Sequence, residues 1–275
     1  MSKIRAAVLI LTKNEEPVIA RTLQSVADFD QIVVVDSGSK DRTEDIARGH
    51  GAEVVRFEWN GRYPKKKEWA LLHAPLRHGW VLYLDADEVV TKELSEEIRH
   101  RLETADSLGI AAFDVTIDYH FMGRKLRHGH KVSKRVLVRR DKTQWPQVDD
   151  LGAVNMWEVE GHYQPVVEGR VDALKATMAH EDLDSLYDYF GRHNRYSDWE
   201  AHLLARPGAA EEVLRHRSVR AQRYARIPFR PFAFFVYAYL LRGGCFDGSA
   251  GFHYAVAQSF YLWQVGVKAK EFRRG

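Results

Sequence analysis

The chain has 275 residues, of which 45% are hydrophobic and 29% are charged, so it can bury a sizeable core and has the charge content of an ordinary soluble protein. Its formal net charge of +3 is too small to indicate nucleic-acid binding by itself, and we expect no nucleic-acid partner. The single cysteine, Cys245, excludes a disulfide within the chain and fits a reducing compartment.

We expect neither a signal peptide nor a membrane-spanning helix. The apolar run at residues 6–11 is too short for a signal peptide and leads into polar residues rather than a cleavage site. No stretch of about 18 apolar residues occurs. The sequence therefore predicts a cytoplasmic protein, which would be peripheral on the inner face of the plasma membrane if it touches lipid.

The first hundred residues alternate between apolar runs and amphipathic segments. Buried strands are expected at residues 6–11, 32–35, 53–57 and 80–84. Helices are expected to open near Asn14, Asp41, Lys66 and Lys92. This alternation predicts an α/β fold with a parallel sheet and helices on both faces.

The rest of the chain has a different character. Residues 113–119 alternate between apolar and polar, which predicts a half-exposed strand, and residues 135–139 predict another. Residues 141–169 are expected to be loops with at most one strand. Helical spacing predicts helices at residues 183–204, 232–241 and 252–272, with a break at Gly243–Gly251.

Three polar clusters follow predicted strands, at residues 12–15, 36–39 and 85–88. Ligands of open parallel sheets bind outside the carboxyl ends of the strands, so these clusters are expected to meet. Asp85 and Asp87 could together serve a hard cation and a ribose or metal-bound water. The alternative is a solvated strand end that caps the next helix. For Asp36, the alternatives are a ligand contact and a simple turn.

Residues 9–16, 33–43 and 82–90 together resemble the family 2 inverting glycosyltransferases. They are most similar to the branch that includes lipopolysaccharide core glucosyltransferases. Further matching stretches are residues 121–124, 135–140, 180–186, 195–197 and 244–252. The resemblance therefore covers nearly the whole chain and is weakest across residues 144–169.

The resemblance implies a GT-A nucleotide-diphospho-sugar transferase fold, with a mainly parallel central sheet flanked by helices and a helical C-terminal region. It assigns Asp36 to the nucleobase or ribose, Asp85 to the ribose side of the donor and Asp87 to the metal. Residues 65–67 lie where relatives carry a basic residue near the donor phosphates, and which lysine makes the contact stays open. The predicted donor-binding residues are Thr12, Asn14, Glu15, Asp36, Ser37, Lys66, Lys67, Asp85 and Ala86.

The implied metal is Mg²⁺ or Mn²⁺. A lone histidine is more often structural than a ligand. His180 nevertheless follows an apolar stretch, and many GT-A enzymes bring a C-terminal histidine to the metal or the diphosphate. We therefore predict Asp87 and His180 as the metal ligands.

An inverting transfer needs a base that removes the proton of the acceptor hydroxyl. The base should come from outside the donor half, because it acts on the opposite face of the sugar. Candidates in the irregular segment are Asp149, Asp150, Glu158, Glu160 and His162. Related sequences have a Val-His-Glu run here, which favours Glu160, although the histidine is missing, and leaves Asp150 and Glu158 in reserve. The alternative is loop acids satisfied by nearby arginines.

The C-terminal third combines arginines with aromatic residues. Residues 206–230 hold seven arginines against Glu211 and Glu212. This region could bind nucleic acid, lie on an anionic membrane surface, or present a solvated arginine face over a helical core. The membrane reading fits an enzyme with a lipid-linked acceptor.

The sequence thus predicts an inverting glycosyltransferase that moves a sugar from a UDP-linked donor to a hydroxyl of a glycan or lipid-linked acceptor in cell-envelope polysaccharide or lipopolysaccharide synthesis. One alternative is a nucleotidyltransferase, which usually has a Gly-rich phosphate loop that residues 12–17 lack. Another is an inactive membrane-associated nucleotide-sugar-binding protein. The expected divisions are a donor half at 1–110, an acceptor and catalytic half of the same domain at 111–182, and a helical basic-aromatic region at 183–275.

Overall fold

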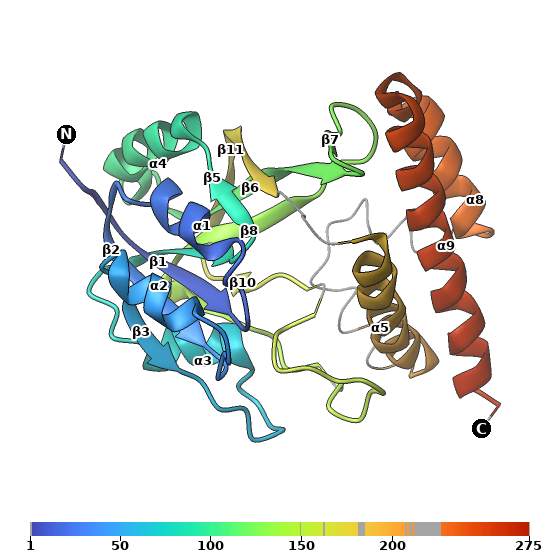
Figure 1. The fold of residues 1–275 in the computed structure, drawn as a ribbon, viewed down its shortest axis with the longest axis horizontal. Coiled ribbons are helices and arrows are strands. Elements are labelled where there is room, and N and C mark those ends of the chain that lie inside the picture. The colour runs from blue at the N-terminus through green and yellow to red at the C-terminus, as the bar shows by residue number, and fades with distance from the viewer. Residues whose placement is uncertain are drawn as a thin grey trace. The chain divides into compact units, whose positions relative to one another are not determined.

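The computed structural model describes residues 2–148, 150–161, 163–180, 185–206, 208, 211 and 227–274 (Figure 1). The chain divides into two compact units. Unit 1 comprises Met1–Asp118, Val132–Pro146 and Pro165–Glu181. Unit 2 comprises Tyr119–Lys131, Gln147–Gln164 and Asp182–Gly275.

Half of the sheet in unit 1 is parallel. Its strands are β1 (Ile4–Thr12), β2 (Phe29–Asp36), β3 (Glu53–Arg56) and β4 (Trp80–Asp85). They lie in the order β3-β2-β1-β4, and each neighbouring pair is parallel. The apolar runs of β1, β2 and β4 are buried because the sheet is covered on both faces, which confirms the four strands expected from the sequence.

The other half of the sheet is antiparallel where its pairing is resolved. It contains β5 (Glu88–Val90), β6 (Ile110–Phe121), β8 (Ser133–Arg139) and β11 (Arg170–His180). Strand β8 runs antiparallel to β4 and β6, and β11 runs antiparallel to β5. The sequence predicts β6 and β8 but misses β5 and β11. Strand β5 has only three residues, and β11 is half-exposed along much of its length, so neither has a strong apolar pattern.

The described part of unit 1 has four α-helices and one 3₁₀ turn, η1 (Arg140–Lys142). The α-helices are α1 (Ile19–Ser25), α2 (Thr43–Gly49), α3 (Lys66–His73) and α4 (Lys92–Ala105). Right-handed crossovers from β1 to β2 and from β2 to β3 put α1 and α2 on the same face of the sheet, which is turned toward the viewer in Figure 1. A two-stranded ribbon, β9 (Thr143–Gln144) with β10 (Val166–Val167), completes the described part of this unit.

The first helix begins at Ile19 and not, as predicted, at Asn14. Asn14 has a left-handed backbone, with φ of 58°. The amides of Asn14 and Glu15 donate to side-chain oxygens of Ser39 and Thr43, at 2.7 and 2.8 Å. These bonds hold the segment as a loop against the second strand–helix connection, so it is unavailable for a helix.

The region at residues 183–275 that was expected to be helical belongs to unit 2, and its described part is helical. It contains α5 (Leu186–Ala205), α8 (Arg230–Phe235), the π-helical η2 (Val236–Leu241), the 3₁₀ turn η3 (Gly244–Asp247) and α9 (Gly248–Phe272). The end of β6 and β7 (Arg124–Lys125) form a short hairpin in this unit. Its core is aromatic, with the Phe121 ring 5.2 Å from that of Tyr189 and 5.5 Å from that of Tyr254.

The predicted break at Gly243–Gly251 is too long, because α9 already starts at Gly248. Gly251 allows α9 to pack closely against the preceding turn η3. A Cβ atom there would lie 2.0 Å from the carbonyl oxygen of Gly244, so only glycine fits. Among the described residues, no helix is long and apolar enough to cross a membrane.

Candidate active site

The ends of three parallel strands bring polar side chains together in unit 1. Thr12 of β1 is in register with Asp36 of β2, and its neighbour Leu11 is in register with Asp85 of β4. The Thr12 hydroxyl donates to Asp36 Oδ2 at 2.9 Å. The clusters that the sequence predicted to converge therefore do lie at one edge of the sheet.

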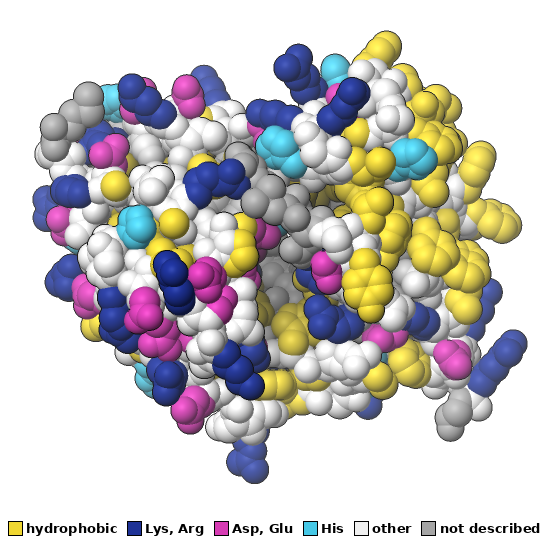
Figure 2. Space-filling model, in the orientation of Figure 1, with side chains coloured by type: hydrophobic (Ala, Val, Ile, Leu, Met, Phe, Trp, Pro, Cys, Tyr) yellow, Lys and Arg dark blue, Asp and Glu magenta, His cyan; other side chains and the backbone are white. Residues whose placement is uncertain are grey.

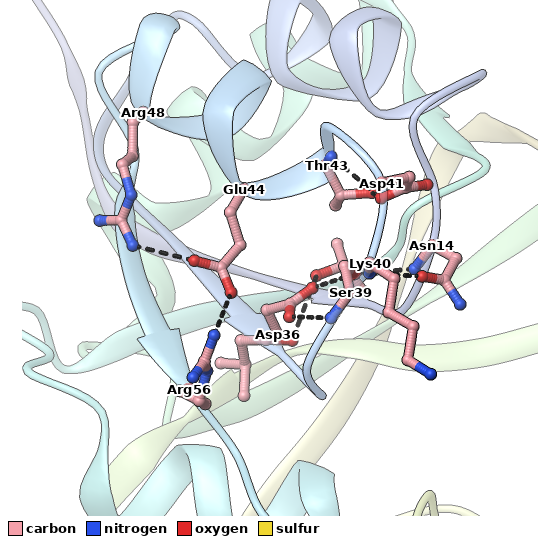
Figure 3. A network of polar contacts seen from close by, with 11 residues as sticks. Asn14, Asp36, Ser39, Lys40, Asp41, Thr43, Glu44, Arg48 and Arg56 are labelled. Atoms are coloured by element: carbon pink, nitrogen blue, oxygen red, sulfur yellow. Dashed lines mark hydrogen bonds and ion pairs between the residues drawn. The ribbon is translucent and has the colours of Figure 1, made fainter.

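Asp36 organises the loop around it (Figure 3). Its carboxylate accepts from the Ser39 amide at 2.7 Å and from the Ser39 hydroxyl at 2.5 Å. The carboxylate is buried, which would raise its pKa, but these hydrogen bonds and that from Thr12 lower the pKa of Asp36 below its usual value. Asn14 joins the network through its side-chain oxygen, which accepts from the Lys40 amide at 2.8 Å. Asp36 is thus a fixed anion in a rigid loop.

The surroundings of Ser37, the residue after Asp36, favour a ligand site here. Its amide donates to the carbonyl of Thr12 at 3.1 Å. Its hydroxyl oxygen is buried and has no hydrogen-bond partner among the described residues. A buried hydroxyl without a partner is costly, and a ligand that supplied one would remove that cost.

The lysines of the α3 start have different surroundings. Lys66 is buried, and its Nζ donates to the carbonyl of Thr12 at 2.7 Å, so it braces the end of β1. Lys67 Nζ lies 5.5 Å from the ring centroid of Trp145. The charge of Lys67 also acts on Asp85 and lowers its pKa. Among the lysines at the start of α3, Lys67 is therefore the one whose charge is linked to Asp85, whereas the charge of Lys66 acts on Glu15.

Two further residues complete the surroundings of Asp85: Lys134, which the sequence did not single out, and Glu88, which belongs to the predicted cluster at residues 85–88 but was given no role of its own. Lys134 Nζ lies 3.1 Å from Asp85 Oδ2 and 2.5 Å from Glu88 Oε1. Glu88 is buried, and its other oxygen accepts from the Asp85 amide at 3.0 Å. Lys134 shares one face of β8 with the buried Val136 and Val138. A lysine on the buried face at the end of a strand is the sequence signal that could have identified Lys134 as a partner of the acidic cluster.

The two carboxylates of the Asp85-Ala86-Asp87 triplet are electrostatically different. Burial would raise the pKa of Asp85, but the charges of Lys134 and Lys67 lower it well below the usual range. Burial raises the pKa of Asp87, the His180 charge opposes this, and Asp85 adds to it. Asp85 is therefore a stabilised anion, whereas the ionised form of Asp87 is disfavoured until a cation joins it.

The pKa of Glu15 is also affected by the negative charges gathered at this site. Burial, followed by the charges of Asp87, Asp85 and Asp41, raises the pKa of Glu15 to about 7. A carboxyl that holds its proton near neutral pH is typical of functional clusters rather than of solvated strand ends.

Asp87 and His180 fit a divalent cation. His180 Nδ1 lies 3.5 Å from Asp87 Oδ1, near the separation of about 3 Å between adjacent ligands of an octahedral Mg²⁺ ion. The backbone supports the pair, because His180 of β11 is in register with Glu88 of β5. Within the described ranges, no group of three or more His, Cys, Asp or Glu side chains is placed to hold a metal ion. Mg²⁺ and Mn²⁺ sites commonly use one or two protein ligands and take the others from substrate phosphates and water.

The candidate bases belong to unit 2. Asp150 is fully buried and accepts a hydrogen bond from Trp199 Nε1 at 2.8 Å, which suits a structural carboxylate. Glu160 is 5% exposed and Glu158 is partly exposed. The other two candidates, Asp149 and His162, lie outside the described residues.

The family profile described as Glycosyl transferase family 2 matches residues 7–157, more than half of the chain. The chain belongs to glycosyl transferase family 2. The α/β architecture with a central sheet, flanking helices and a helical C-terminal region agrees with the predicted GT-A fold.

Similar proteins differ in how much of the chain they match. The lipopolysaccharide core biosynthesis glycosyltransferase LpsC of Rhizobium meliloti is 24% identical, over 97% of this chain and 92% of its own length. An uncharacterized glycosyltransferase of Rickettsia bellii is 40% identical over 35% of this chain. The chain spans only about a third of that relative's length, 32%.

A solved structure is also similar over part of the chain. Glucosyl-3-phosphoglycerate synthase from Mycobacterium tuberculosis, in complex with Mn²⁺, UDP and glucosyl-3-phosphoglycerate, is 26% identical with a TM-score of 0.32. The match covers 43% of this chain and 44% of that one.

In this family 2 glycosyltransferase, the ion pair between Lys134 and Glu88 should carry stability. We expect Lys134→Met to lower the free energy of unfolding by about 3 kcal/mol, because it leaves the buried Glu88 carboxylate without this ammonium group. Urea unfolding measures the change. The double variant Glu88→Gln with Lys134→Met should recover at least half of the loss. Simple additivity of the two single variants would contradict this role of the pair.

The backbone beside Glu160 is fixed by close packing on Trp199. A Cβ atom at Gly161 would lie 2.5 Å from Trp199 Cζ2. We therefore expect Gly161→Ala to displace Glu160 and to lower kcat about tenfold to a hundredfold, with UDP affinity unchanged. Gly152→Ala is the matched control, since its Cβ would meet Arg206 Nη2 at 3.7 Å and His202 Cε1 at 3.9 Å, which are ordinary van der Waals contacts. Equal turnover by the two variants would show that the position of Gly161 has no catalytic consequence.

Proposed function

We propose that this glycosyltransferase inverts the anomeric configuration of a sugar that it takes from a UDP-linked donor, with Mg²⁺ or Mn²⁺ as cofactor. The observation that carries the proposal is the convergence of Thr12, Asp36 and the Asp85–Asp87 triplet at one edge of the parallel sheet. This is the edge where open α/β sheets bind nucleotides.

The geometry of unit 1 supports the donor-side roles that we propose. The rigid Asp36 anion and the Ser37 hydroxyl suit the base and ribose, which present N–H and O–H groups. Lys67 places a positive charge beside the acidic cluster, where it can offset the diphosphate. Asp87 and His180 would hold the cation, and that cation, when bound, stabilises the negative charge of the departing diphosphate.

The base must remove a proton from the acceptor hydroxyl as the hydroxyl oxygen attacks the anomeric carbon. We assign this role to Glu160. Its side chain is only 5% exposed, so bulk water is largely kept from the group that would take the proton. Asp150 is less suited, because its carboxylate already accepts from the Trp199 indole.

The acceptor class rests on the similarity to LpsC, which extends over nearly the whole chain. We infer a glycan or lipid-linked acceptor hydroxyl in lipopolysaccharide or related envelope polysaccharide synthesis. The single cysteine suits a reducing compartment, so we place the protein on the cytoplasmic side.

The competing proposals are a nucleotidyltransferase and an inactive nucleotide-sugar-binding protein. Family membership argues against the first. Measured turnover distinguishes the proposed enzyme from the second, an inactive nucleotide-sugar-binding protein. We expect Mn²⁺-dependent UDP release from at least one UDP-sugar, and a transferred product whose anomeric proton signal in NMR shows inversion. Donor binding without release from any nucleotide sugar would identify an inactive protein, and a retained configuration would overturn the inverting mechanism.

A further inference from the structure

Helix α9 of unit 2 presents a second apolar stripe in addition to the one that it buries. Its buried side chains include Tyr254, Tyr261 and Val265. A separate set at spacings of four, four, three and four residues is 41–51% exposed, and consists of Phe252, Val256, Phe260, Trp263 and Val267. At 1.5 Å per residue this stripe is about 22 Å long.

The neighbouring helical segment extends this surface. Exposed apolar side chains on α8 and η2 and at their ends are Phe229, Phe232, Leu240 and Leu241, at 84%, 71%, 56% and 75% exposure. The Phe252 ring of α9 lies 6.0 Å from that of Phe235 and 5.6 Å from that of Tyr239, so the two surfaces adjoin. We call them together the apolar face. Figure 2 shows hydrophobic side chains gathered over α8 and α9.

The exposed apolar side chains of this face adjoin one another instead of being scattered singly. Contiguous apolar faces of this kind mark interaction sites. It is also confined to one side of α9, because the opposite side packs within unit 2. Because the opposite side of α9 is buried within unit 2, only the exposed stripe of this helix could enter a membrane interface, and the helix axis would then lie along the membrane surface. This agrees with the finding that no described helix could span a membrane.

Positive charge borders the apolar face at both ends of α9. Exposed Arg242 precedes the helix, and residues 270–274 at its other end contain three cations and one acid. In the sequence, residues 206–230 lead directly into α8 with seven arginines and two glutamates. A face with a basic border matches an anionic lipid surface, to which each Lys or Arg adds attraction.

The same charges disfavour a second copy of the chain as the occupant. A two-fold interface brings the same patch of both copies together. With cations at both ends of α9, parallel and antiparallel pairings alike set basic groups against basic groups, and like charges across an interface oppose binding. The Phe and Trp side chains suit the headgroup boundary, where aromatic residues are enriched.

We propose that the apolar face docks the protein on an anionic membrane, with α9 lying in the interface plane. The phenylalanines and Trp263 enter the boundary between headgroups and acyl chains, while the basic border contacts anionic headgroups. This inference is independent of the proposed transfer reaction, because donor binding involves unit 1.

Vesicle sedimentation with the full chain tests the proposal. We expect the protein to sediment with phosphatidylcholine vesicles that contain about 30% phosphatidylglycerol, and much less with phosphatidylcholine alone. Binding should weaken as salt rises from about 0.05 to 0.5 M, because the headgroup attraction is screened. The double variant Phe260→Ser with Trp263→Ser should bind at least about tenfold more weakly, since it removes apolar contacts from the interface.

The control replaces exposed apolar residues elsewhere, with Leu72→Ser and Leu108→Ser, which are 56% and 52% exposed. It should bind vesicles as the unchanged protein does. Thermal unfolding and UDP binding should be alike in all three proteins, which separates this test from that of the transfer reaction. No sedimentation of the unchanged protein with anionic vesicles would overturn the proposal. Equal vesicle binding by the two double variants would also overturn it. A dimer of the unchanged protein in sedimentation analysis, present in the Leu72 and Leu108 variant but dissociated in the Phe260 and Trp263 variant, would overturn it as well.

Discussion

We expect Asp87→Ala to have the largest effect, a loss of about a thousandfold in kcat/KM for sugar transfer. This corresponds to about 4 kcal/mol of activation free energy. The reason is that the raised pKa of Asp87 disfavours its ionised form unless a cation is present, and Asp87 lies 3.5 Å from His180, its proposed co-ligand. Without it, the negative charge of the departing diphosphate loses most of its compensation. Initial rates of UDP release with saturating Mn²⁺ measure the effect.

The matched control is Asp45→Ala, which removes an exposed aspartate of α2 in the same unit and should leave the rate unchanged. Asp87→Ala should also lose the metal dependence of UDP binding. If it transfers sugar at the normal rate, then Asp87 is not a metal ligand, and the roles of the triplet need to be reassigned.

Glu160→Gln is the second change with a large expected effect. We expect kcat to fall by about a hundredfold to ten-thousandfold, which is the usual contribution of a general base. Gln keeps the shape of the side chain but cannot take a proton. UDP affinity should stay the same, because an interaction of the transition state is lost and not one of the ground state. Single-turnover transfer and UDP titration measure the two quantities separately.

Glu158→Gln and Asp150→Asn are the comparisons that give this result its meaning. Glu158 is in the same loop and partly exposed, and its change should have little effect on kcat. Asp150→Asn should lower stability instead, because the buried carboxylate accepts from Trp199. A normal kcat for Glu160→Gln together with a large loss in Glu158→Gln would move the base to Glu158.

The donor half was readable from the sequence because its physics is local. Strands that are buried on both faces need unbroken apolar runs, and β1, β2 and β4 have them. A parallel sheet then fixes which strand ends meet, so Thr12, Asp36 and Asp85 could be brought together before any coordinates. Helix α3 begins at Lys66, as predicted, because the apolar spacing that marks this helix lies within a few residues.

Other features depend on contacts between distant segments. The loop at Asn14 is held by side chains about 25 residues away, so its helix-like sequence was misleading. The ion pair of Lys134 with Asp85 and Glu88 joins β8 to the end of β4, a pairing that spacing along the chain does not encode. Strand β11, which carries His180, has a weak alternation because several of its residues are half-exposed.

We propose that the ends of β1, β2 and β4 form a metal-dependent site for a nucleotide diphosphate. Calorimetric titration of the full chain with UDP, with Mn²⁺ and with a chelator, tests it most directly. We predict that Mn²⁺ tightens UDP binding at least about tenfold, because the cation joins the Asp87 carboxylate to the diphosphate. Equal affinity with Mn²⁺ and with the chelator, or no binding of UDP in either, would contradict it.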